Sequence, residues 1–174
     1  METNVKDNYD TCIALVLQHE GNFVHHPKDP GGATNKGVTK KVWEEWVGRT
    51  VSIDEMKALT VEDVKPLYKK NYWDRVRGDD LPAGVDYAVF DVAVNSGVVR
   101  AAKFLQAALG LNQDGVIGPA TLAAVAAANA RELVTDICEK RLAFMQSLPI
   151  WSTFGKGWQR RVDEVEKKAF EMAS

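Results

Sequence analysis

The chain has 174 residues, which suits one domain or a compact pair, and 45% of them are hydrophobic, enough for a sizeable core. Its 22 basic and 24 acidic residues give a net charge of −2, so there is little support for nucleic-acid binding. The longest apolar stretch, residues 122–128, is far too short to cross a bilayer, and we expect no stable membrane insertion. The polar first eight residues lack the basic and apolar regions of a signal peptide, so we expect synthesis in the cytoplasm and delivery elsewhere by another factor.

Helical signals dominate the chain, and no period-two alternation is long enough for a large sheet. The sequence therefore predicts a mainly α fold, with N-caps at Asn8, Thr39, Ser52 and Thr60 and a helix stop at Gly48. The predicted helices span residues 8–20, 40–47, a short segment after 52, 61–76, 82–96, 98–109, 119–129, 130–147 and 156–172. Residues 21–38, which are rich in glycine and contain two prolines, read as a loop with a possible short hairpin.

Glu20 occupies an unusual position for a charged residue. The first helix has an apolar stripe that continues at Glu20 and consists of Tyr9, Cys12, Ile13, Val16 and Leu17. A carboxyl on the buried face of the last helical turn favours its neutral form, both because of burial and because of the helix dipole. A carboxylic acid that stays protonated near neutral pH is what general acid catalysis requires. The alternative is that Glu20 simply reaches solvent at a frayed helix end.

Asp29 lies in the loop that leaves this helix, and such a loop can place it opposite Glu20 across a cleft. Two facing carboxyls, one in an apolar place and one in a polar loop, have separated pKa values. Glycoside hydrolysis requires such a pair, and Thr34 can hold the attacking water through its hydroxyl. The alternative for Asp29 is a turn-forming residue before Pro30.

Several segments together resemble a known family. They are Glu20–Phe23, Asp29–Thr39, Asn71–Trp73 and Phe90–Gly97. They look like the signature of glycoside hydrolase family 108, lysozyme-like N-acetylmuramidases found among phage endolysins and secretion-associated muramidases. Residues 113–121 resemble the predicted peptidoglycan-binding module that usually follows. The resemblance covers about residues 8 to 170 and implies a lysozyme-like helical fold with a Gly-rich loop or short hairpin at the active-site cleft.

The resemblance implies that Glu20 is the catalytic acid and that Asp29 and Thr34 line the same site. The gap between Asp29 and Thr34 is one residue shorter than in similar phage lysozymes, which makes Thr39 a reserve candidate. Asn22 replaces a second glycine that the family often has after Glu-Gly.

A glycan groove needs flat apolar faces and polar partners, and the candidates are Tyr72, Trp73, Tyr87 and Asn95. The alternative for Tyr72 and Trp73 is core packing, and the alternative for Asn95 is a helix C-cap.

Metal binding has little support, because His19, His25 and His26 lack a clustered set of acids or cysteines, and no cofactor is expected. Cys12 and Cys138 lie in apolar helical patterns, so the default is two buried free thiols, although a disulfide between them stays open.

A division is expected near Gly97, with a catalytic region at residues 8–97 and a helical, peptidoglycan-binding-like region at residues 98–172 packed on it. The second region suits structural support or wall binding. The sequence thus predicts a muramidase that cleaves the β-1,4 bond between N-acetylmuramic acid and N-acetylglucosamine in peptidoglycan glycan strands, acting on the cell wall or periplasm. The alternatives are a non-catalytic peptidoglycan-binding or secretion-assisting protein, and a chitinase- or chitosanase-like hydrolase.

Overall fold

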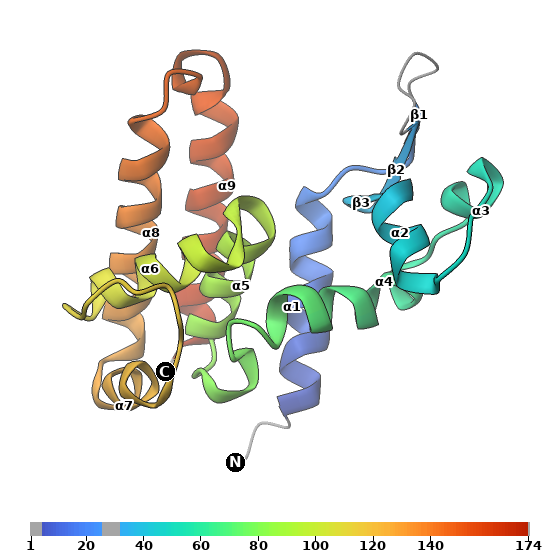
Figure 1. The fold of residues 1–174 in the computed structure, drawn as a ribbon. Helices are drawn as coiled ribbons and strands as arrows, with labels where there is room; N and C mark the ends of the chain where they lie inside the picture. Colours follow the sequence, from blue (N-terminus) through green and yellow to red (C-terminus); the bar gives the residue numbers. More distant parts are fainter. Residues whose placement is uncertain (1–4, 26–31, 174) are drawn as a thin grey trace. The chain divides into compact units, whose positions relative to one another are not determined.

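The computed structural model of this protein describes residues 5–25 and 32–173. Within those ranges the chain is mainly helical, as predicted, with one small antiparallel sheet (Figure 1). The elements in chain order are α1 Val5–His19, β1 Val24–His25, β2 Ala33–Asn35, β3 Val38–Thr39, α2 Lys40–Val47, α3 Ile53–Lys57, α4 Val61–Tyr68, the π-helical turn η1 Lys69–Trp73, the 3₁₀ turn η2 Gly78–Asp80, α5 Val85–Ser96, α6 Val98–Ala108, α7 Pro119–Ala127, α8 Ala130–Gln146 and α9 Trp151–Met172. None of the described helices is both long and apolar enough to span a membrane.

The chain forms two compact units. One unit is Ile13–Asn71, and the other combines Met1–Cys12 with Tyr72–Ser174. Helix α1 therefore contributes its first half to one unit and its second half to the other. The predicted division into residues 8–97 and 98–172 stays a prediction.

The unit Ile13–Asn71 contains the sheet, whose strands follow the order β1-β2-β3. Strand β2 pairs with β1 through Val24 and Thr34, and with β3 through Thr34 and Thr39. Asn35 pairs with Val38, so Lys36 and Gly37 form a two-residue hairpin turn. Both turn residues have positive φ, +51° and +77°, which is the geometry of a type I′ turn. The short hairpin expected in the Gly-rich segment is therefore present.

Local capping chemistry fixes the helices of this unit where the sequence predicted. The Thr39 hydroxyl accepts a hydrogen bond from the Val42 backbone N–H, and α2 ends at Gly48 in the left-handed conformation. Thr60 and Asp63 form a complete capping box at the start of α4. The α-helix ends at Tyr68 and continues as the π-helical turn, where the sequence predicted a helix up to residue 76.

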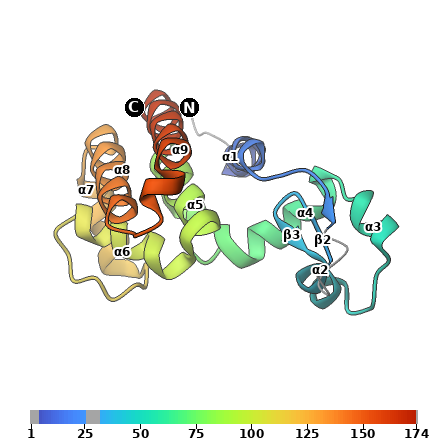
Figure 2. The same ribbon diagram turned by 90° about the horizontal axis from the view of Figure 1, so that it is seen from above.

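Helix α5 is the centre of the other unit, and every residue of Val85–Ala93 is buried. It packs against α6, α8 and α9, and Figure 2 shows α8 and α9 lying side by side next to it. An apolar helix that is buried on all its faces must be covered by several partners, which explains why α5 carries few polar residues.

Two helix starts differ from the prediction. Helix α1 begins at Val5, so Asn8 is not its N-cap; its side-chain amide instead donates to the Asp86 carboxylate at the start of α5. Helix α9 begins at Trp151 and not at residue 156, and Gly155 and Gly157 lie inside it. Cys12 and Cys138 are both buried free thiols.

Candidate functional site

Glu20 follows directly after the last residue of α1, His19, and its side chain is half-buried. The expected apolar stripe is present, since Cys12, Ile13 and Val16 are fully buried. The stripe anchors the helix, and Glu20 stands at its end, where the backbone leaves α1 for the sheet.

The turn Lys36–Gly37 lies against the Glu20 side chain. A Cβ atom added to Gly37 would come within 2.9 Å of Glu20 Oε2 and 2.4 Å of the Tyr68 hydroxyl oxygen. The Glu20 carboxylate and the Tyr68 hydroxyl therefore both lie next to Gly37, which has no side chain. The absence of a Cβ at Gly37 is what leaves room for both oxygens.

Two hydrogen bonds hold this turn in place. The Lys36 backbone N–H donates to the Gly21 carbonyl at 3.1 Å, and the Tyr68 hydroxyl donates to the Lys36 carbonyl at 2.7 Å. Tyr68 is buried, with 2% of its surface exposed. The backbone beside Glu20 is thus fixed on one side by the residue that follows the acid and on the other by the end of α4.

Strand β2 places Thr34 on the face opposite to its two buried neighbours, Ala33 and Asn35. The Asn35 amide donates to the Met56 carbonyl at 2.9 Å, and it also reaches the Lys57 and Leu59 carbonyls. This anchor ties the buried face of the strand to the end of α3. Thr34 is half-buried on the other face, and Thr39 lies directly across from it.

The reserve candidate Thr39 already has a structural role, because its hydroxyl caps α2. Among the described residues the Thr34 hydroxyl has no hydrogen-bond partner, so it can bind a water molecule or a ligand. Asp29, the expected partner of Glu20, lies outside the described residues.

Two of the four predicted substrate-binding residues are buried. The Trp73 ring packs 5.2 Å from the rings of Tyr9 and Phe90 between centroids, and its indole N–H donates to Asp79 at 2.7 Å. Tyr87 is 2% exposed, and burial raises the pKa of its phenol. The structure gives both side chains a place in the core, which agrees with the core-packing alternative for Trp73. Tyr72 is half-buried.

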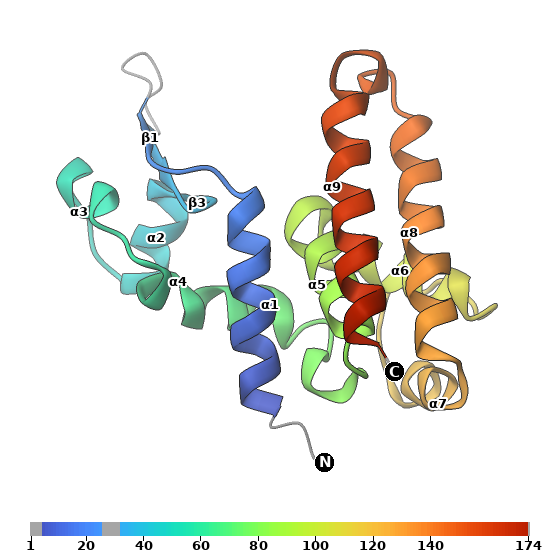
Figure 3. The ribbon, with the colours of Figure 1, turned by 180° about the vertical axis from the view of Figure 1, so that it is seen from behind.

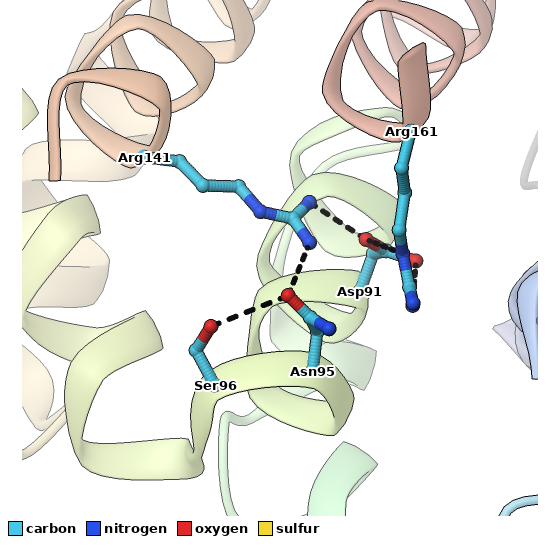
Figure 4. Close-up of polar contacts among 5 residues, drawn as sticks. All are labelled: Asp91, Asn95, Ser96, Arg141 and Arg161. Carbon is cyan, nitrogen blue, oxygen red and sulfur yellow. Dashed lines mark hydrogen bonds and ion pairs between the residues drawn. The ribbon is translucent and has the colours of Figure 1, made fainter. Parts of the chain in front are cut away.

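Asn95 is exposed at the end of α5, and its side chain is held in one orientation (Figure 4). Its amide oxygen accepts a hydrogen bond from Arg141 at 3.1 Å, so the amide nitrogen points away from Arg141 as a donor. Arg141 also binds Asp91 at 2.6 Å, and Arg161 binds the same carboxylate at 3.0 Å. The helix C-cap is instead Gly97.

The Asp91 carboxylate is completely buried. Burial alone would raise the pKa of Asp91, but the guanidiniums of Arg141 and Arg161 outweigh burial and hold it below its usual value. The cluster therefore stays ionised and joins α5 to α8 and α9.

The sequence did not point to Tyr68, Arg141 or Arg161. Tyr68 bonds a residue 32 positions away, and the two arginines bond Asp91 across 50 and 70 positions, so no local sequence pattern marks them. Glu20 and Thr34 belong to the unit Ile13–Asn71, whereas Tyr72, Trp73, Tyr87 and Asn95 belong to the other. No set of three metal-binding side chains gathers within the described ranges.

Comparisons with known proteins give two family matches and a structural match. The model of the family described as Glycosyl hydrolase 108 matches residues 13–97, and that of the family described as Predicted Peptidoglycan domain matches residues 100–163. A solved structure titled "Structure of Brucella abortus SagA" is 48% identical in sequence, covers 96% of each chain and superposes with a TM-score of 0.81. A search of curated proteins finds no match.

Proposed function

This chain belongs to glycosyl hydrolase family 108, and on that premise we propose that it is an N-acetylmuramidase with Glu20 as its general acid. It is a glycoside hydrolase whose residues 100–163 match a predicted peptidoglycan domain. The proposed substrate is the β-1,4 bond between N-acetylmuramic acid and N-acetylglucosamine in peptidoglycan glycan strands.

The observation that carries the proposal is the position of the Glu20 carboxylate. It is half-buried at the end of α1 and lies against Gly37 and the hydroxyl of the buried Tyr68. A proton donor for a glycosidic oxygen must be fixed and reachable at the same time. A side chain that follows a helix with one buried face and rests on a glycine turn meets both conditions.

The reaction needs a second carboxylate and a water molecule. We assign the carboxylate role to Asp29, which stabilises the oxocarbenium-like transition state or activates water, and we assign the water to Thr34. The half-buried position of Thr34 on β2 and its unused hydroxyl among the described residues support this role. Glu20 protonates the leaving oxygen, so the bond breaks without an alkoxide leaving group.

Glu20→Gln tests the assignment. Gln has the same shape but cannot donate a proton to the leaving oxygen, so we expect the clearing of purified cell walls to fall by at least about 100-fold, the usual contribution of general acid catalysis. Mass spectra of the sugars released by the wild type should show N-acetylmuramic acid at the new reducing ends.

Glu62→Gln is the matched control, because the side chain of Glu62 is 79% exposed and lies in the same unit. It should clear walls as fast as the wild type. Equal clearing by Glu20→Gln and the wild type would remove Glu20 from the mechanism. If the wild type binds walls without clearing them, the non-catalytic alternative is favoured. If N-acetylglucosamine stands at the new reducing ends, or if only chitin oligomers are cleaved, a chitinase- or chitosanase-like hydrolase is favoured.

A further inference from the structure

Aromatic and aliphatic side chains that are exposed or half-buried gather where α9 begins. Helices α8 and α9 form a hairpin, and its connecting end lies opposite to the end near α7 (Figures 1 and 3). Ile150 and Phe154 are 50% and 54% exposed at this end, and Trp151 and Trp158 lie half-buried beside them. We call the three aromatic residues together with Ile150 the aromatic patch.

Two of the three rings of the patch are nearly parallel, and the third, Trp151, is tilted by 56° from Trp158. Phe154 and Trp158 are stacked, with centroids 6.0 Å apart and planes inclined by 21°, and Trp151 adjoins Trp158 at 6.2 Å. Gly155 supports the arrangement, since a Cβ there would come within 2.6 Å of the Trp151 ring. Glycine is unfavourable inside a helix, but here it lets the indole lie against the helix backbone.

A hollow that contains polar groups adjoins these rings. It measures about 570 Å³ and is lined by Trp151, Ser152, Thr153, Gly155, Lys156 and Gln159. The hollow thus places two hydroxyls, one ammonium and one amide next to the aromatic rings. Large apolar side chains that remain exposed together, with polar groups at their edge, mark an interaction surface.

Among possible occupants, a sugar chain fits this combination. One face of a pyranose ring consists of C–H groups, which stack on flat aromatic rings, while hydroxyl and acetamido groups at its edge need hydrogen-bonding partners. A lipid surface would favour apolar and basic groups without the hydroxyls and the amide. The patch also lies in residues 100–163, the segment that matches the predicted peptidoglycan domain.

We propose that the aromatic patch and the hollow beside it bind the glycan strand of peptidoglycan. The sugar faces stack on Phe154 and Trp158, and Lys156 and Gln159 donate hydrogen bonds to acetamido and hydroxyl oxygens. The surface uses none of the residues assigned to catalysis. It holds the enzyme on the wall and rests on the proposed function only for the identity of the substrate.

The test measures binding in the absence of turnover. The full chain carrying Glu20→Gln is mixed with sacculi from which an amidase has removed the stem peptides, and the bound fraction is measured by co-sedimentation. Phe154→Ala and, separately, Lys156→Ala are added to this background. We expect each to weaken binding by about tenfold, the effect of losing one good contact in an interface.

Phe170→Ala is the matched control, because Phe170 is 41% exposed on the same helix but lies outside the patch. It should bind as tightly as the parent chain, and circular dichroism should show the same helix content in all variants. Equal binding by the parent and both patch variants would overturn the proposal. Binding that requires the stem peptides would overturn it as well.

Two further outcomes would assign the patch to another partner and so overturn the proposal. One is binding to vesicles of phosphatidylglycerol and phosphatidylethanolamine that Phe154→Ala abolishes while binding to sacculi is kept. The other is a dimer in analytical ultracentrifugation that the same substitution dissociates. Neither result bears on the proposed muramidase activity, because that activity is tested by wall clearing with the wild type and without the patch variants.

Discussion

At the scale of single residues, the proposed site is most sensitive to substitution at Gly37. Its φ of +77° disfavours any other residue, and its missing side chain leaves space for the Glu20 carboxylate and the Tyr68 hydroxyl. We expect Gly37→Ala to reduce wall clearing by at least about tenfold, because a displacement of about 1 Å at a catalytic group has effects of this size or more. Clearing of purified walls is the measurement.

Gly48→Ala separates backbone strain from displacement of the acid. Gly48 also has a positive φ, +74°, but no atom lies within 4 Å of the position that a Cβ would occupy. Both substitutions should lower the melting temperature, and only Gly37→Ala should reduce clearing. A similar loss of clearing in both variants would show that strain, and not the position of Glu20, limits activity.

Asp86 makes stability depend on pH between 3.8 and about 7. Burial raises its pKa from 3.8 to about 7, although the backbone N–H groups of Tyr87 and Gly84 and the Asn8 amide act in the opposite direction. Since the folded state favours the protonated acid, this contribution to stability is complete below pH 3.8 and is lost as the pH rises towards about 7.

The measurement is the free energy of unfolding in urea as a function of pH, for the wild type and for Asp86→Asn. Asn cannot ionise, so the stability of the variant relative to the wild type should increase as the pH rises from 3.8 to about 7 and then stay constant. A difference that is independent of pH would contradict the raised pKa of Asp86.

At the scale of elements, the sequence predicted those helix ends that local side chains determine. Thr39, Gly48 and Thr60 act within a few residues of themselves, and all three end or begin a helix where predicted. The start of α9 was missed because its N-cap, Ile150, makes no side-chain hydrogen bond. Asn8 looked like a cap, but its amide bonds a residue 78 positions away, and such a contact leaves no local pattern.

In the candidate site, too, features that follow local sequence patterns could be predicted, and contacts between distant residues could not. Glu20 and the Gly37 turn could be predicted, since a helical stripe and a run of glycines are local patterns. The hydrogen bond from Tyr68 to Lys36 joins residues 32 positions apart, and the ion pair of Arg141 with Asp91 joins residues 50 positions apart. Such pairs depend on how elements pack, which periodicity does not specify.

The two glycines inside α9 are predicted to respond differently to the same substitution. At Gly157 no atom lies within 4 Å of an added Cβ, so Gly157→Ala should stabilise the protein by up to about 1 kcal/mol, the difference in helix propensity. At Gly155 the Trp151 ring occupies that space, so Gly155→Ala should lose this gain. Urea unfolding compares the two, and an equal increase for both would contradict the packing of Trp151 on Gly155.

At the scale of the whole molecule, the two segments matched by the family models share one buried ion cluster. Asp91 lies in residues 13–97, while Arg141 and Arg161 lie in residues 100–163. The buried residues of α5 are also covered by α6, α8 and α9. The C-terminal segment therefore has a structural role in the protein in addition to any wall binding.

Consequently, we expect a chain that ends at residue 97 not to fold on its own. It would expose the apolar faces of α5 and leave the Asp91 carboxylate without its two guanidiniums. Circular dichroism should show no cooperative thermal transition, and a sharp transition for this fragment would contradict the expectation.

Arg141→Met in the full chain isolates the contribution of the ion cluster. It leaves the buried Asp91 with one guanidinium in place of two, and breaking a buried pair in this way costs about 3–5 kcal/mol. Arg77→Met is the matched control, since Arg77 and its partner Asp80 have side chains that are 46% and 50% exposed, and it should cost less than about 1 kcal/mol. Urea unfolding measures both, and similar small costs would show that the ion pair of Arg141 with Asp91 adds little to the apolar packing of α5.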